Sequence, residues 1–148
     1  MISRLALFWL LVTCIFSTNA RGEENSRSVE LKAWTVHATN THGRMDDRLK
    51  RIGKHLSRLK YSGFSFLGSQ GGTVQKGGKI GMPVPGKREV QLTLLSSSDE
   101  RSRVRVKVTG RSKVLLDTTV SVKRNGFFIV AGPRHEDGIL VLPIFARY

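Results

Sequence analysis

Cysteine is almost absent from this 148-residue chain, because Cys14 is its single example. It lies in a segment typical of a secretory signal peptide: Arg4 precedes a twelve-residue apolar run, Leu5 to Phe16, and small residues lead to Ala20. We expect cleavage after Ala20, so that residues 1–20 are removed. The mature chain would then have no thiol, which excludes disulfides, cysteine-held metals and thiol catalysis.

A second reading of the same segment stays open. Leu11-Val12-Thr13-Cys14 has the form of a bacterial lipoprotein box, although Thr13 stands where glycine or alanine is usual and the apolar run continues past Cys14. The run is too short for an ordinary membrane-spanning helix, which needs about 20 residues. We therefore expect an exported protein, periplasmic or extracellular, with lipidation at Cys14 as the alternative and no transmembrane segment after cleavage.

Acidic residues are also scarce. The chain has 11 Asp and Glu against 25 Lys and Arg, which gives a formal net charge of +14 at pH 7. Such a charge favours anionic partners, which for an exported protein are lipid headgroups, anionic glycans or acidic proteins. The alternative is that the charge only keeps the protein in solution.

Motifs that carry chemistry are missing as well. There is no His-Glu-x-x-His pattern, no Gly-x-Ser-x-Gly elbow, and no glycine-rich loop that ends in Gly-Lys-Ser or Gly-Lys-Thr. The four histidines, His37, His42, His55 and His135, are scattered, and the carboxylates come mostly as adjacent pairs in turns. The sequence therefore predicts no metal site, no cofactor, no catalytic residue and no enzyme.

The remaining chain is organised as a mobile leader, 21–28, and one mainly β domain, 29–148. Residues 29–39 predict a strand with two apolar faces, and therefore an interior strand. Residues 46–60 change to helical spacing, with Leu49, Ile52, Leu56 and Leu59 within one arc and Asp46 as N-cap. We expect one amphipathic helix after the first strand, packed on an antiparallel sheet or sandwich of about seven to nine strands.

Glycine and turn residues divide the rest into strands. Seven glycines between Gly68 and Gly86 predict only short strand pieces near 73–75 and 79–82. Alternation then predicts hairpins over 88–123, with Val90 opposite Val106 and, across a three-residue loop, Val106 opposite Leu116. Val114, Leu116, Val120 and Val122 should be buried. Asn125-Gly126 predicts a further hairpin, Gly132-Pro133 should break the returning strand, and 139–145 should form an interior strand except at Pro143.

Two rows of cations are the candidate anion-binding residues. The strand row consists of Arg101, Arg103, Arg105 and Lys107, and the helix row of Lys50, Arg51, Lys54 and Arg58. The predicted registers place Glu89 opposite Lys107 and Asp117 opposite Arg105, which would neutralise part of the strand row. Aromatic residues are missing around the outer face of that strand, so we do not expect a nucleic-acid partner.

These observations favour a non-enzymatic binding or accessory protein of the cell envelope that contacts an anionic surface or an acidic protein. One alternative is a structural subunit of a secretion, motility or adhesion assembly, with Trp34, Phe64, Phe128 or Tyr148 at its interface. A hydrolase without a recognisable motif is a third. The sequence does not indicate an oligomeric state.

Overall fold

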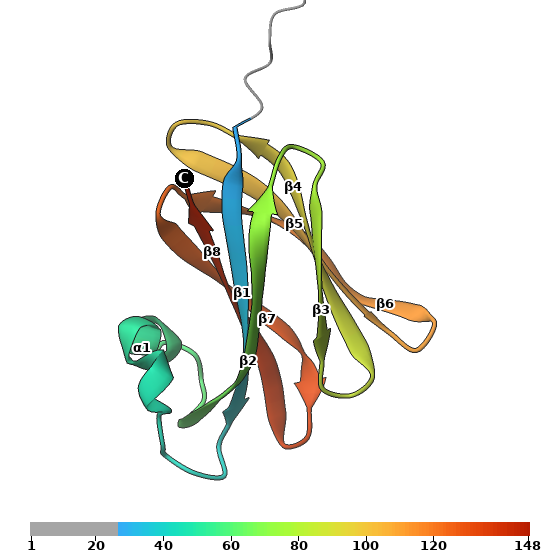
Figure 1. Ribbon diagram of the computed structural model, residues 1–148. Coiled ribbons are helices and arrows are strands. Elements are labelled where there is room, and N and C mark those ends of the chain that lie inside the picture. Colours follow the sequence, from blue (N-terminus) through green and yellow to red (C-terminus); the bar gives the residue numbers. More distant parts are fainter. Residues whose placement is uncertain (1–26) are drawn as a thin grey trace, which may run out of the picture.

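The structure, a computed structural model, describes residues 27–148. The predicted signal peptide, the Cys14 alternative and most of the 21–28 leader lie outside the described residues. Within residues 27–148, eight strands and one short helical segment form a two-sheet sandwich (Figure 1), which confirms the predicted mainly β, antiparallel fold. The strands are β1 (Val29–Thr39), β2 (Gly63–Val74), β3 (Lys79–Val84), β4 (Arg88–Ser97), β5 (Arg101–Gly110), β6 (Lys113–Lys123), β7 (Gly126–His135) and β8 (Gly138–Arg147).

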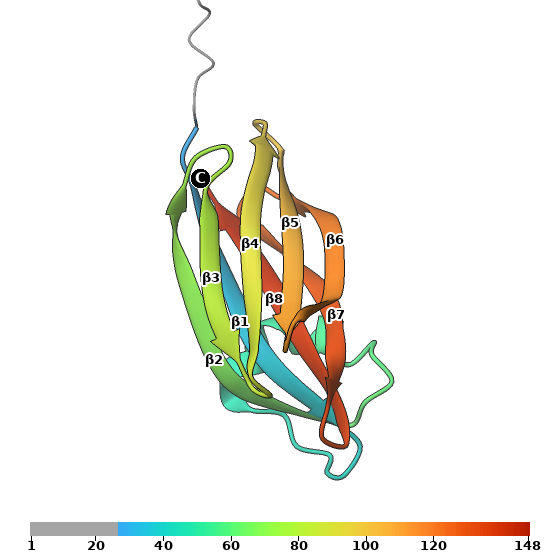
Figure 2. The same cartoon turned by 90° about the vertical axis from the view of Figure 1, so that its right-hand side faces the viewer.

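Each sheet has four antiparallel strands, in the orders β2-β1-β8-β7 and β3-β4-β5-β6 (Figure 2). Their facing sides enclose one apolar core that includes Leu31, Leu92, Val106 and Leu142. β1 and β8 are interior strands, as predicted, and pair with each other antiparallel. That pairing is interrupted at Leu142 and Pro143, because proline has no backbone N–H to donate.

The helical segment is shorter than the predicted 46–60. It is a 3-10 helix, η1 (Asp47–Ile52), followed by a single α-helical turn, α1 (Gly53–Leu56). Gly53 lies at the junction, where low helix propensity weakens a continuous helix. The predicted cap is confirmed, because the Asp46 side chain accepts a hydrogen bond from the Arg48 N–H at 3.0 Å. Beyond Leu56 the chain continues in tight turns, such as the bond from the Leu59 N–H to the Leu56 carbonyl.

This segment packs on the outer face of the β2-β1-β8-β7 sheet. Leu49, Ile52 and Leu56 are fully buried in a second apolar cluster with residues of β1, β2 and β8. β1 therefore buries apolar residues on both faces, one toward the central core and one toward the helix, as its sequence predicted. Among residues 27–148, no helix is long and apolar enough to cross a membrane.

The glycine-rich region departs from the prediction. The short piece predicted near 79–82 is observed as β3, but the piece predicted near 73–75 belongs to the end of β2, a continuous twelve-residue strand that pairs with β1 along its length. Glycine suits this strand because a Cβ on Gly71 would approach the Leu31 carbonyl oxygen to 2.9 Å. Leu67 is an extra residue in the β1–β2 register, which makes it a β-bulge. Pairing with an interior strand therefore outweighs the low strand propensity of glycine here.

The predicted hairpin registers are wrong by two residues. Val90 pairs with Val108, and Val106 pairs with Thr118, so Glu89 lies opposite Thr109 rather than Lys107. A shift of two residues keeps the same side chains inward, and the valines of β5 are buried as expected.

The turn between β5 and β6 explains part of the register error. It has two residues, Arg111 and Ser112, with Ser112 at φ 66°, rather than the predicted three. A bulge at Leu115 follows it. Val114 is 51% exposed, contrary to the prediction that it is buried, because the bulge interrupts the alternation at that point. Val120 and Val122 are buried, and Leu116 packs against the core.

Asn125-Gly126 forms a turn but not a hairpin. β6 belongs to one sheet, and β7 pairs with β8 in the other, so the turn carries the chain across the sandwich. Asn125 has φ 53°, and its side-chain oxygen accepts a hydrogen bond from the Tyr148 N–H at 3.2 Å. Gly132-Pro133 does not end the strand either, because it forms a bulge within a continuous β7.

Candidate functional site

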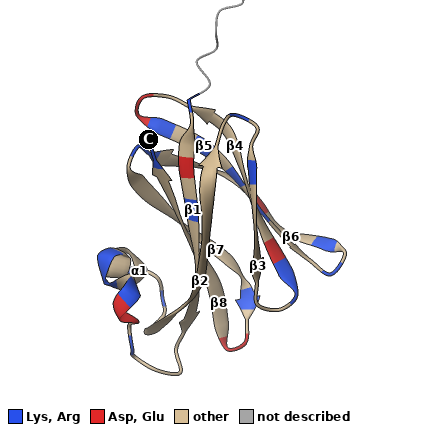
Figure 3. Ribbon diagram, viewed as in Figure 1, with Lys and Arg blue, Asp and Glu red and all other residues tan. Residues whose placement is uncertain are grey.

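The two predicted cation rows lie on opposite faces of the sandwich. The β5 valines point into the central core, so the strand row faces outward from its sheet. The helix row is carried by a segment that packs on the outside of the other sheet. Figure 3 shows Lys and Arg on both sides of the molecule. A flat partner therefore cannot contact both rows at once.

The strand row is partly neutralised from within. Asp117 binds Arg105 through two hydrogen bonds, Nε to Oδ1 at 2.8 Å and the guanidinium NH2 group to Oδ2 at 2.6 Å. These bonds hold the pKa of the Asp117 carboxyl below its usual value. The predicted pair exists although Asp117 is directly opposite Lys107 in the register, because arginine reaches its diagonal neighbour. Arg101 and Arg103, at the other end, lie opposite Lys123 and Ser121.

The helix row is exposed along its length. Lys50 forms an ion pair with Asp47 at 2.9 Å, but both side chains are largely in solvent, where such pairs contribute little. Arg51 differs from the others because its guanidinium lies 5.9 Å from the centre of the Phe145 ring. It is the predicted site residue that the fold brings together with charged and aromatic residues from other elements.

Arg51 lines a hollow of about 240 Å³ on the outer face of the β2-β1-β8-β7 sheet, which we call the Trp34 hollow. Its apolar part is formed by Trp34 and Phe145, whose ring centres are 4.6 Å apart. Lys32 from β1 and Arg147 from β8 line it too, together with one carboxylate, Glu30. Three cations, one acid and an aromatic wall can hold an anionic group that adjoins an apolar or ring-shaped surface.

Four of these residues, Lys32, Trp34, Phe145 and Arg147, were not predicted to bind anions. Alternation does place Lys32 and Trp34 on one face of the first strand, and Phe145 and Arg147 on one face of the last. The missing information was the pairing of the two strands, which sets Lys32 opposite Phe145. No pattern in the local sequence predicts a pairing between two strands that lie so far apart in the chain.

The predicted interface residues are mostly covered. Phe64 is only 2% exposed, because it lies beneath the helical segment. Trp34 and Tyr148 are half-buried, whereas Phe128 is 43% exposed. Phe128, Leu67 and Val114 are the exposed large apolar side chains among residues 27–148. They lie on three different strands, and single exposed apolar side chains are ordinary on protein surfaces.

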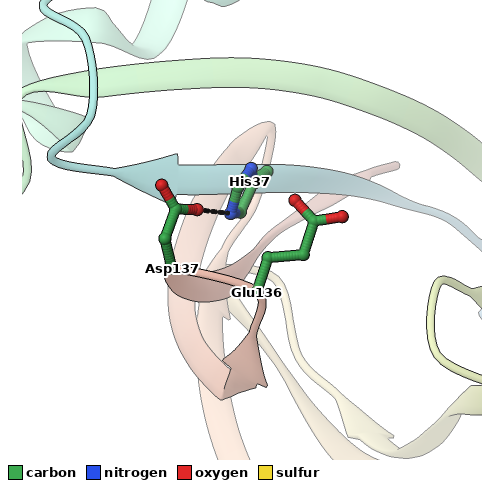
Figure 4. Close-up of side chains that lie close together, drawn as sticks. All are labelled: His37, Glu136 and Asp137. Atoms are coloured by element: carbon green, nitrogen blue, oxygen red, sulfur yellow. Dashed lines mark ion pairs between the residues drawn. The ribbon is translucent and has the colours of Figure 1, made fainter.

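A second group of chemically active side chains lies where β1 meets the β7–β8 turn. This histidine cluster consists of His37, His135, Glu136 and Asp137, and Figure 4 shows three of them, His37, Glu136 and Asp137. The Nε2 atom of His37 is 3.3 Å from Oδ1 of Asp137, and the two imidazole rings are 5.3 Å apart in an edge-to-face arrangement. His37 and His135, which lie far apart in the sequence, are therefore neighbours in the structure.

The β7–β8 turn lies close against the end of β1. A methyl group on Gly138 would collide with the backbone carbonyl of Ala38, so only glycine allows this approach. The approach lets Thr39 donate a hydrogen bond from Oγ1 to Oδ2 of Asp137 at 2.6 Å. That bond is the main reason why the pKa of Asp137 lies below its usual value. Asp137 is therefore an oriented, ionised carboxylate.

The cluster does not have the arrangement of a hydrolytic triad. A nucleophilic hydroxyl would bind the imidazole of its general base, whereas the Thr39 hydroxyl binds the carboxylate of Asp137. Asp137 and Glu136 also lie at the surface, with side chains 40% and 70% exposed. The cluster therefore suits the holding of a cation better than acyl transfer.

Comparisons of this chain with protein-family models, with curated proteins and with solved structures find no match.

Proposed function

We propose that this chain is a non-enzymatic, exported binding protein of the cell envelope that holds an acidic glycan at the Trp34 hollow. The observation that carries the proposal is the convergence of Lys32, Arg51 and Arg147 around an aromatic wall. These cations come from β1, the helical segment and β8. Export rests on the predicted signal peptide.

The attraction between opposite charges depends on how much water surrounds them. Two opposite unit charges 4 Å apart attract by about 1 kcal/mol in water, but by about 4 kcal/mol at an effective dielectric constant of about 20. Lys32, Arg51 and Arg147 are themselves exposed, so each alone gains only the smaller amount. The hollow differs from the open strand row because its three cations meet beside one aromatic wall. Glu30 reduces the net charge of the hollow, and it offers an acceptor for a hydroxyl group. Carboxylate or sulfate groups next to sugar rings and hydroxyls match this combination.

The experiment measures retention on immobilised heparin, a sulfated and carboxylated glycan, over a rising salt gradient. We expect Arg51→Glu/Arg147→Glu to elute at much lower salt than the wild-type protein. The matched control is Arg101→Glu/Arg103→Glu, which changes the net charge equally on the opposite face. It tests the strand row, whose anion-binding role also remains a prediction, and it should shift elution less.

Three outcomes would contradict the proposal. Equal shifts in the two variants would assign retention to overall charge, and retention that does not respond to salt would exclude an electrostatic site. Trp34→Leu removes part of the aromatic wall of the hollow. It should therefore weaken retention on heparin if the ligand is a glycan. Sedimentation with anionic lipid vesicles that exceeds glycan binding would favour a membrane surface instead.

A further inference from the structure

We propose that His37, Glu136 and Asp137 form a binding site for a divalent transition-metal ion, with Zn²⁺ as the best-fitting ion. The proposal is independent of the Trp34 hollow, because it concerns the opposite end of β1. One nitrogen and two carboxylate oxygens from these residues lie within 4.8 Å of one another. Tetrahedral Zn²⁺ with ligands at about 2.0–2.1 Å requires ligand atoms about 3.3 Å apart, and Nε2 of His37 is 3.3 Å from Oδ1 of Asp137.

The His37 imidazole carries the strongest indication of a ligand. Its side chain is 12% exposed, and its Nε2 atom is buried and has no hydrogen-bond partner. Oδ1 of Asp137 lies 3.3 Å away, at ion-pair distance (Figure 4), but the contact does not have hydrogen-bond geometry. A buried polar atom without a hydrogen-bond partner is rare and costs free energy. A metal ion between the imidazole and the carboxylates would provide that partner.

The neighbouring residues are arranged as in metal sites. The Thr39 hydroxyl holds Oδ2 of Asp137 and leaves Oδ1 directed at His37, and such outer hydrogen bonds orient metal-binding carboxylates in proteins. Glu136 is exposed, so its side chain can rotate to close the distance to an ion. Nε2 of His135 is 3.8 Å from Oε1 of Glu136, but His135 lies outside the group of ligand atoms within 4.8 Å of one another, so it would have to move to become a fourth ligand.

The type of donor atom restricts the metal. Ca²⁺ and Mg²⁺ prefer sites made entirely of oxygen, whereas imidazole nitrogen combined with carboxylate suits Zn²⁺ and its neighbours in the first transition series. Three protein ligands leave a tetrahedral ion with one position for water, His135 or a group from a partner. Bound metal would join the β7–β8 turn to the end of β1.

The test uses the untagged, chelator-treated protein and titrates Zn²⁺ by calorimetry and Co²⁺ by visible absorption. We expect saturation at one ion per chain and the strong visible bands of four-coordinate Co²⁺. Glu136→Gln and Asp137→Asn should each weaken binding at least about tenfold. Glu136 is largely exposed, so its substitution tests the site even where His37→Gln fails to fold.

Matched controls change the same residue types elsewhere. His55→Gln and Asp99→Asn should leave affinity and stoichiometry unchanged, because neither residue is near the cluster. Absence of saturable binding would overturn the proposal. It would also be overturned if the Glu136 and Asp137 variants bound as tightly as the wild-type protein, or if His55→Gln removed the binding.

Discussion

Truncation of Leu56 to alanine should loosen the helical segment from the sheet. The segment is too short to be stable alone, since isolated helices below about 12–15 residues are marginal in water. It is held by its buried side chains, of which Leu56 is 0% exposed. The substitution removes three carbon groups, each worth about 0.8 kcal/mol on burial. The remaining cavity raises the expected loss in the free energy of unfolding to about 3–5 kcal/mol.

The measurement is urea unfolding followed by circular dichroism, with thermal unfolding beside it. For a domain of this size, Tm should fall by roughly 3–5 °C per kcal/mol, so by about 9–25 °C in total. Leu59→Ala is the matched control, because Leu59 lies in the turns just after the segment and is only half-buried. Its expected loss is about 1 kcal/mol. The Leu56 variant should also elute from heparin at lower salt, since Arg51 would no longer be held beside Phe145.

Two results would refute this reasoning. A loss below about 1 kcal/mol in Leu56→Ala would show that the segment does not depend on its buried face. An equal or larger loss in Leu59→Ala would show that the packing differs from the one described. If an otherwise folded Leu56→Ala protein eluted from heparin at the same salt concentration as the wild-type protein, Arg51 of the helix row would not contribute to binding at the Trp34 hollow.

Two further predictions concern stability. Hydrogen bonds from Arg48 hold the pKa of Asp46 far below its usual value, so the stability that they contribute is complete above about pH 4 and is lost as pH falls toward the lowered pKa. The Tm difference between the wild-type protein and Asp46→Asn should thus be larger at pH 7 than at pH 3, and a constant difference would contradict this. Gly138→Ala should cost about 1–3 kcal/mol in urea unfolding, because its methyl group meets the Ala38 carbonyl. Gly43→Ala, which meets no atom within 4 Å, should be close to neutral, and equal losses would refute the close approach.

Much of the fold could be predicted from local sequence patterns. The two apolar faces of β1 and the buried triplet Leu49, Ile52 and Leu56 follow from periodicity alone, and both are observed. The registers were off because turn length and bulges depend on backbone conformation, which alternation does not encode. The bulge at Leu115 and the left-handed Ser112 are examples.

The candidate sites were harder to predict. The strand row and the helix row were readable as surface charge, but the relation between them depends on how the sheets stack. The Trp34 hollow requires β1 to pair with β8, and the histidine cluster requires the β7–β8 turn to reach the end of β1. Both contacts join residues from nearly opposite ends of the domain, and no pattern in the neighbouring sequence predicts either contact.

The antiparallel pairing of β1 with β8 also gives the molecule two distinct poles. Glu30 lies opposite Arg147, so the start of the first strand and the end of the last meet at one pole, as Figure 1 shows. The other pole carries His37 and the β7–β8 turn, and β1 spans about 35 Å between them at about 3.3 Å per residue. A surface that held the chain through a tether before Val29 would therefore have the Trp34 hollow close to it. The histidine cluster would face away, toward whatever lies opposite that surface.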